Sequence, residues 1–201
     1  MKCKNTIAMV LAGAMLLPSN AFAADLSQYR DFPNDWSAKS LEQAIDDGLL
    51  NGSNGMIDAK GLLTRAQMAA IVSRAFGAAK TASLDDYRDV LPSAWYYSDM
   101  GKAVKMGAFQ GANGLLNPDA PITRAEFAAI AARFDDKNTN NTSNFSDIAS
   151  HWAKDEIGVA ANKGWINGYP DSTFRPDQYI TRAEAMTLVN RVLNRLPEKS
   201  E

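Results

Sequence analysis

The stretch ITRAE fills residues 122–126 and recurs unchanged at residues 180–184, and a near copy, LTRAQ, fills residues 63–67. In each copy a threonine is followed three residues later by Glu or Gln. This pattern is typical of a capping box, in which the two side chains accept hydrogen bonds from each other's backbone amides at the start of a helix. Apolar residues then follow with the spacing of one helix face. The sequence therefore predicts three amphipathic helices, capped by Thr64, Thr123 and Thr181.

The arginine of each stretch needs a separate explanation. It occupies the first helical position, where the helix end carries about half a positive charge and a cation is disfavoured. Three cations at one position indicate a counter-charge. Free helix amides and a guanidinium together suit an anionic ligand, above all a carboxylate, but a salt bridge to an aspartate of the protein would also serve. The arginines are Arg65, Arg124 and Arg182, and the candidate aspartates are Asp31, Asp89 and Asp147.

Other residues recur at matching offsets and divide the chain into three units of one kind. Each unit has an aspartate, then a tryptophan, then two glycines, and ends with the Thr-Arg-Ala helix. The units span residues 29–77, 87–135 and 145–195. The tryptophans are Trp36, Trp95 and Trp152; the first glycines are Gly48, Gly107 and Gly164; and the second glycines are Gly52, Gly111 and Gly168.

Within a unit, a first helix is expected to begin near the tryptophan and to end at the first glycine, which suits the left-handed position after a helix. A tryptophan at the start of an apolar stripe more often belongs to the core than to a sugar platform, although an indole at a groove edge could do both. Each unit thus reads as helix, loop, helix. Two short helices cannot bury their apolar faces alone, so we expect one all-α domain with long loops, in which the three units pack around a shared centre.

Residues 1–23 have the features of a secretory signal peptide. Lys2 and Lys4 precede an apolar run, and Ala21-Phe22-Ala23 has the form of a cleavage site. The run is too short to span a bilayer. The single cysteine, Cys3, lies in this segment, so the exported chain is expected to fold without disulfides.

The composition of the chain disfavours several classes of function and of binding site. A hydrophobic share of 46% predicts a folded core, and a net charge of −2 without a basic stripe disfavours a nucleic-acid partner. No second apolar run approaches membrane-spanning length. A lone histidine, His151, and no cysteine after residue 23 disfavour zinc sites and Cys-His or Ser-His catalysis. The loop after Asp171 has Arg182 where an EF-hand needs glutamate. We therefore expect no enzyme, no metal and no cofactor.

The third unit carries a specific resemblance. Its segments Phe145-Ser-Asp147, His151-Trp152-Ala153, Gly164-Trp-Ile-Asn-Gly168, Thr173-Phe-Arg-Pro176 and ITRAE resemble the S-layer homology motif. The resemblance extends over all three units and is weakest in the first. It implies a non-catalytic, secreted cell-wall anchor, in which three motifs form one pseudo-threefold unit around a central three-helix bundle.

The resemblance also implies a ligand. In the family, grooves between motifs bind secondary cell-wall polysaccharide, best known as a pyruvylated N-acetylmannosamine. By this likeness the three arginines would bind the pyruvate carboxylate. The aspartates would bind sugar hydroxyls or orient the arginines, and the second glycines would let the sugar approach. The first unit has Gln67 for Glu, so its groove is expected to be the weakest. The alternative is a structural envelope protein that binds peptidoglycan or self-assembles, with an S-layer or other exported protein as partner.

Overall fold

The computed structural model describes residues 24–134 and 142–193. The predicted signal peptide, residues 1–23, and the ends of the second and third units lie outside these residues. A short 3₁₀ helix, η1 (Leu26–Gln28), precedes the α-helices; these are α1 (Ala38–Asp46), α2 (Arg65–Ala75), α3 (Tyr97–Lys105), α4 (Arg124–Ala132), α5 (Lys154–Asn162) and α6 (Arg182–Val192). Across the described ranges, extended pairing is limited to isolated bridges. The predicted all-α class is confirmed.

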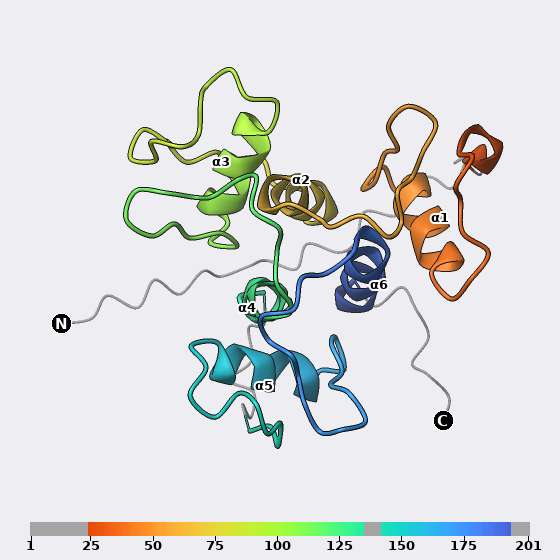
Figure 1. Ribbon diagram of the computed structural model, residues 1–201. Helices are drawn as coiled ribbons and strands as arrows, with labels where there is room; N and C mark the ends of the chain where they lie inside the picture. Colours follow the sequence, from red (N-terminus) through yellow and green to blue (C-terminus); the bar gives the residue numbers. More distant parts are fainter. Residues whose placement is uncertain (1–23, 135–141, 194–201) are drawn as a thin grey trace.

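The second helix of each unit lies near the centre of the molecule, and the first helix lies outside it (Figure 1). The closest helix pairs are α2 with α3, α4 with α5, and α1 with α6. Each outer helix therefore packs on the central helix of the preceding unit, and α1 packs on α6 of the last unit. A packed helix pair therefore joins the second helix of one unit to the first helix of the next unit, and does not coincide with a helix-loop-helix unit of the sequence. The loop between the two helices of a unit carries the chain from one pair to the next.

The aliphatic residue before each threonine takes part in backbone hydrogen bonds that connect the three units at the centre of the molecule. The N–H of Leu63 donates to the carbonyl of Ile180 at 3.2 Å, that of Ile122 to Leu63 at 2.9 Å, and that of Ile180 to Ile122 at 3.1 Å. These three bonds form a closed ring through all three units. The pseudo-threefold arrangement around a central three-helix bundle, which the resemblance implies, stays a prediction.

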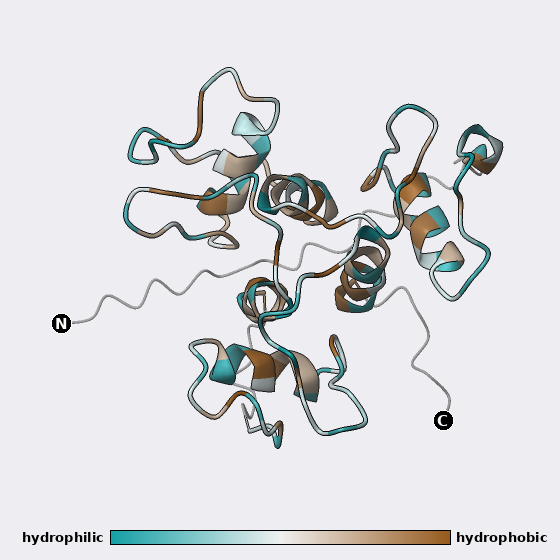
Figure 2. Ribbon diagram, viewed as in Figure 1, coloured by the Kyte–Doolittle hydropathy of each residue, from teal (hydrophilic) through white to brown (hydrophobic). Residues whose placement is uncertain are grey.

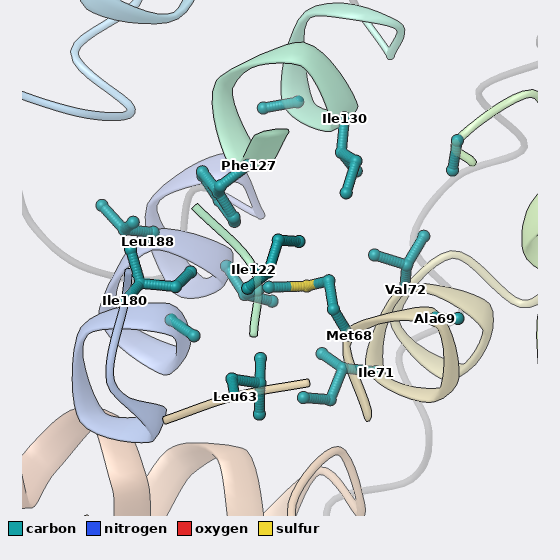
Figure 3. Close-up of a cluster of buried hydrophobic side chains, with 14 of the residues drawn as sticks. Leu63, Met68, Ala69, Ile71, Val72, Ile122, Phe127, Ile130, Ile180 and Leu188 are labelled. Carbon is teal, nitrogen blue, oxygen red and sulfur yellow. The ribbon is translucent and has the colours of Figure 1, made fainter. Parts of the chain in front are cut away.

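The central helices meet through side chains rather than through close backbone packing. Figure 3 shows Met68 and Phe127 pointing toward Ile122, with Leu188 lying beside Ile180, and all five are at least 94% buried. At the far ends of α2 and α4 the rings of Phe76 and Phe134 stack with their centroids 4.1 Å apart. Hydrophobic residues gather on the central helices and linking segments, whereas the outer loops are mostly hydrophilic (Figure 2).

Local signals set the helix ends. Capping boxes are present at the starts of α2, α4 and α6, as predicted from the Thr-x-x-Glu and Thr-x-x-Gln patterns. Gly48, Gly107 and Gly164 follow the outer helices with φ values of 66°, 76° and 67°. These are the left-handed conformations that glycine adopts without steric cost, so the predicted helix ends are confirmed.

Removing one cap is expected to have a modest effect on stability. In Thr181→Ala the hydroxyl oxygen that accepts the N–H of Glu184 is lost, so the free energy of unfolding should fall by about 1 kcal/mol. Urea titration would measure the change. Thr181→Ser keeps the hydroxyl and should retain most of the stability; equal losses in both variants would show that the methyl group, and not the cap, matters.

Candidate ligand-binding grooves

The three predicted site arginines connect neighbouring units. Each donates its Nε–H to a backbone carbonyl of the next unit along the chain, and the arginine of the third unit reaches the first. The bonds run from Arg65 to Leu116 at 2.8 Å, from Arg124 to Phe174 at 2.8 Å, and from Arg182 to Ile57 at 2.9 Å. The arginines therefore occupy the boundaries between units, where the family resemblance implies the grooves.

The charge partners of the arginines differ. Nη1 of Arg65 forms an ion pair with Glu126 at 2.6 Å. Arg124 and Arg182 instead donate Nη2 to the carbonyls of Asn167 and Asn51, at 2.7 and 3.1 Å. Across residues 24–134 and 142–193, neither of these two has a carboxylate within 4.0 Å. The predicted alternative, a salt bridge to the repeated aspartates, is wrong for all three arginines because backbone carbonyls and Glu126 take those bonds.

Arg124 is the most enclosed of the three, with 7% of its surface exposed. Its guanidinium carbon lies 4.9 Å from the ring centroid of Tyr169 and 4.7 Å from that of Phe174. Burial lowers the pKa of Arg124, and the field of Tyr169 and Glu184 acts in the opposite direction. An arginine nevertheless stays charged in proteins. Arg124 thus clamps two units together, and a contact between this side chain and a ligand stays a prediction.

The repeated aspartates accept hydrogen bonds from the same loops whose carbonyls bind the arginines. Each carboxylate accepts two consecutive backbone N–H bonds within its own unit. The donors are Ile57 and Asp58 for Asp31, Leu116 and Asn117 for Asp89, and Phe174 and Arg175 for Asp147. The first donor in each case is the residue whose carbonyl binds an arginine. Each aspartate therefore holds in place the loop segment whose carbonyl accepts the hydrogen bond of an arginine. The contact between the aspartates and sugar hydroxyls stays a prediction.

These bonds predict a loss of stability in acid. Burial would raise the pKa of Asp147, but the N–H groups of Phe174 and Arg175 outweigh it and lower the pKa. A carboxyl whose pKa is lower in the folded state stabilises the fold above its unfolded pKa, about 4, and this contribution disappears as the pH falls through the folded value. The melting temperature should therefore fall below about pH 4. Asp147→Asn should flatten this dependence, whereas Asp119→Asn, at an exposed position, should leave it unchanged; equal curves for all three proteins would contradict the assignment.

The second glycines have a packing explanation. A Cβ atom added to Gly52 would lie 2.3 Å from the ring of Tyr29, one at Gly111 equally close to Tyr87, and one at Gly168 2.1 Å from Phe145. The repeated aromatic that precedes each aspartate thus covers the glycine of its own unit. The predicted role of these glycines in the approach of a sugar is not needed to explain them and stays a prediction.

The tryptophans lie on the surface. Trp36, Trp95 and Trp152 are 64, 65 and 63% exposed. Each precedes its helix by two residues, and the buried positions of the outer helices are taken by Leu41, Met100 and Ile157. The interpretation of the tryptophans as core residues is therefore wrong, because the turn before the helix points the indole outward. Trp152 and Trp36 each line one of the two grooves described below, whereas Trp95 lines neither of them, and a contact between any of the three indoles and a ligand stays a prediction.

One groove brings together all three units, and we call it the Arg65 groove. Its volume is about 280 Å³. Its lining comes from α4 and its C-terminal end, from the 108–117 loop of the second unit, and from one residue of each of the other two units. Its polar and aromatic lining includes Arg65, Phe109, Gln110, Glu126, Arg133 and Trp152. Arg133 is not among the site residues that the sequence predicted.

A second groove lies between the first and third units, and we call it the Trp36 groove. Its volume is about 510 Å³. Trp36 and Lys60 line it together with an excess of carboxylates, which are Asp31, Asp35, Asp58 and Glu184. Ser37 donates hydrogen bonds to the Asp35 carboxylate from its hydroxyl and its N–H, and these lower the pKa of Asp35. Each groove is therefore lined by one exposed tryptophan, Trp152 or Trp36, but the two grooves carry net charges of opposite sign.

Two other site types are missing from the part of the chain that the structure describes. No group of His, Cys, Asp or Glu residues there is arranged to hold a metal ion. No helix within those ranges has both the length and the apolar character needed to cross a bilayer.

Comparison with known proteins identifies the repeats. The model of the S-layer homology domain matches residues 28–69, 86–128 and 144–186, more than half of the chain. The chain is 36% identical over 151 residues to Cell surface glycoprotein 1 of Acetivibrio thermocellus, which covers 67% of this chain and 6% of that protein. It is also 36% identical over 155 residues to the Cellulosome-anchoring protein of the same species, covering 71% of this chain and 34% of the relative.

A further relative is the Exoglucanase XynX of Acetivibrio thermocellus, which is 27% identical over 176 residues, with 83% of this chain and 16% of that protein covered. The chain thus spans about a third or less of the length of these relatives. Three tandem matches, at the positions of the three repeats, establish the relationship. The chain belongs to the S-layer homology domain family.

Proposed function

We propose that this chain is a non-catalytic anchoring module that acts at the cell surface by binding secondary cell-wall polysaccharide. Relatives named as a cell surface glycoprotein and a cellulosome-anchoring protein support the anchoring role. The observation that carries the proposal is the Arg65 groove, in which two arginines, one carboxylate and an exposed indole converge from three units. Its excess of positive charge suits an acidic sugar, such as a pyruvylated N-acetylmannosamine.

Each part of the groove has a role in this proposal. The exposed face of Trp152 packs against the apolar face of a sugar ring, which gains burial for both. Arginine forks bind a carboxylate with two parallel hydrogen bonds. Gln110 and Asn117 offer amide groups to hydroxyls at the groove wall. The hydrogen bond from Arg65 to the carbonyl of Leu116 holds the 108–117 loop in place before a ligand binds.

The Trp36 groove suits a different sugar of the same polymer. Its four carboxylates and one lysine would repel a carboxylate-bearing residue. Carboxylate oxygens accept hydrogen bonds from hydroxyl groups, so this groove fits a neutral sugar stacked on Trp36. Only the Arg65 groove is proposed for the acidic residue.

Catalysis is disfavoured by the chemistry of the Arg65 groove. Most glycoside hydrolases need two carboxyl groups that flank the scissile bond. The lining of this groove supplies one, Glu126. Its oxygens are engaged by Arg65 and by the backbone N–H of Thr123, so it is neither free to protonate a leaving group nor paired with a second acid.

The test measures binding of residues 24–201 to purified wall polysaccharide before and after removal of pyruvate. We expect binding before removal and a large loss after it. Trp152→Ala should weaken binding roughly tenfold, a loss of about 1.4 kcal/mol. Trp95→Ala is the matched control, since Trp95 is equally exposed but lines neither groove. Equal binding to pyruvate-free polymer, or to intact peptidoglycan, would favour the structural tether instead.

A further inference from the structure

The segment that leads into η1 is bonded to the C-terminal end of α1. The backbone N–H of Ala24 donates to Oδ1 of Asp46 at 2.7 Å, in a part-buried contact. The next residue is fixed as well, because the carboxylate of Asp25 accepts hydrogen bonds from the N–H and the hydroxyl of Ser27. Figure 1 shows η1 and α1 at the same outer edge of the molecule. Ala24 thus has a defined place beside the last residue of α1.

The C-terminal end of α1 differs in charge from the ends of the other two outer helices. Asp46 is the last residue of α1, and Asp47 is its C-cap. The two residues at the equivalent positions are Lys105 and Met106 for α3, and Asn162 and Lys163 for α5. The carbonyl end of a helix carries about half a negative charge, so a cation is favoured there and a carboxylate is disfavoured. α1 therefore has two anions where each of the other outer helices has a lysine.

Cleavage of the chain before Ala24 would place a cation at this end of α1. Within residues 24–134 and 142–193, no lysine or arginine forms an ion pair with Asp46. The small residues Ala21 and Ala23 indicate a signal peptidase site directly before Ala24. Hydrolysis of that peptide bond adds one water molecule, whose oxygen stays in the new carboxylate of Ala23 and whose two hydrogens join the amide hydrogen on the nitrogen of Ala24. The product is an α-ammonium group, which is charged at neutral pH.

We propose that removal of the signal peptide before Ala24 creates an ion pair between the new α-ammonium group and the carboxylate of Asp46. The nitrogen that gains the charge is the atom that already lies 2.7 Å from this carboxylate. α1 packs on α6 and so joins the first unit to the third. Processing of the chain therefore stabilises the helix that completes the contacts between units. The inference is independent of the proposed function, because neither Ala24 nor Asp46 lines the Arg65 groove or the Trp36 groove.

The position of the cut is tested with the full chain, residues 1–201, expressed in a bacterial host that exports it. The intact mass of the exported protein should be that of a chain whose first residue is Ala24. A mass that places the cut at another peptide bond would overturn the inference, because the charge would then arise on a different nitrogen.

The ion pair is tested on the exported protein by calorimetry, with the α-amino group either free or acetylated. Acetylation removes the charge and leaves an N–H donor. It should shift the folding equilibrium about fivefold toward the unfolded chain and lower the melting temperature by roughly 2–4 °C. In Asp46→Asn, acetylation should have no effect. In Asp119→Asn, which removes an exposed carboxylate of the second unit, the full effect should remain. Added salt should reduce the difference between the free and the acetylated wild type.

Two results of the calorimetry would overturn the inference. The first is a melting temperature of the wild type that does not change on acetylation. The second is an equal fall in the wild type and in Asp46→Asn, which would show that the α-ammonium group acts on another partner. Neither result bears on sugar binding, so the proposed function would stand in both cases. Conversely, a wild type that binds no wall polysaccharide would overturn the proposed function and leave this inference unaffected.

Discussion

Deleting the third unit, residues 142–201, should abolish the cooperative unfolding of the remaining chain. The deletion removes α6, the packing partner of α1. It also opens the ring of hydrogen bonds at Ile180 and removes the bonds from Arg182 to the first unit. Short helices are marginal in water without tertiary packing, so α1 should not stay folded alone. Residues 24–201 should show a sharp thermal transition by calorimetry, and residues 24–141 should not.

Fragment complementation provides the control. If the loss comes from a missing partner, adding residues 142–201 to residues 24–141 should restore a transition whose midpoint rises with concentration. Residues 142–201 alone should also lack a sharp transition, because α5 packs on α4 of the deleted part. A sharp transition in either fragment by itself would contradict the offset pairing as the source of stability.

Arg124→Ala should be the most destabilising of the arginine substitutions, lowering the free energy of unfolding by about 3 kcal/mol. Two buried or part-buried carbonyls, of Phe174 and Asn167, would lose a charged donor. The space between the rings of Tyr169 and Phe174 would also be left poorly filled. Urea unfolding would measure the change, provided the transition stays two-state.

A matched control is Arg30→Ala. Arg30 is exposed and donates one bond to the carbonyl of Asn54 within its own unit, so its loss should cost no more than about 0.5 kcal/mol. Arg124→Lys should rescue Arg124→Ala only partly, because a lysine lacks the flat fork that reaches both carbonyls. An Arg124→Ala protein that is as stable as the wild type but no longer binds polysaccharide would make Arg124 a ligand contact and not a clamp.

The repeats, the helix starts and the helix ends could be read from the sequence. The reason is physical: a capping box such as Thr181 with Glu184 joins residues three apart, and a C′ glycine such as Gly164 acts on its own helix. Such signals are complete within a few residues, so a sequence without structure contains them whole. The family also follows from this local pattern, because the motif is repeated three times at fixed spacing.

The site required the tertiary structure. Arg182 binds the carbonyl of Ile57, 125 residues away in the sequence, and no local pattern indicates that an outer helix packs on the preceding unit. The indole of Trp152 is exposed because of a turn before α5, although its place in the apolar stripe favoured the core. The charge of a groove is a sum over side chains from different units, and that sum is defined only when the ring of units has closed. For this reason Glu126 pairs with Arg65, whereas Arg124 and Arg182 donate to backbone carbonyls, a difference that three nearly identical Thr-Arg-Ala stretches could not reveal.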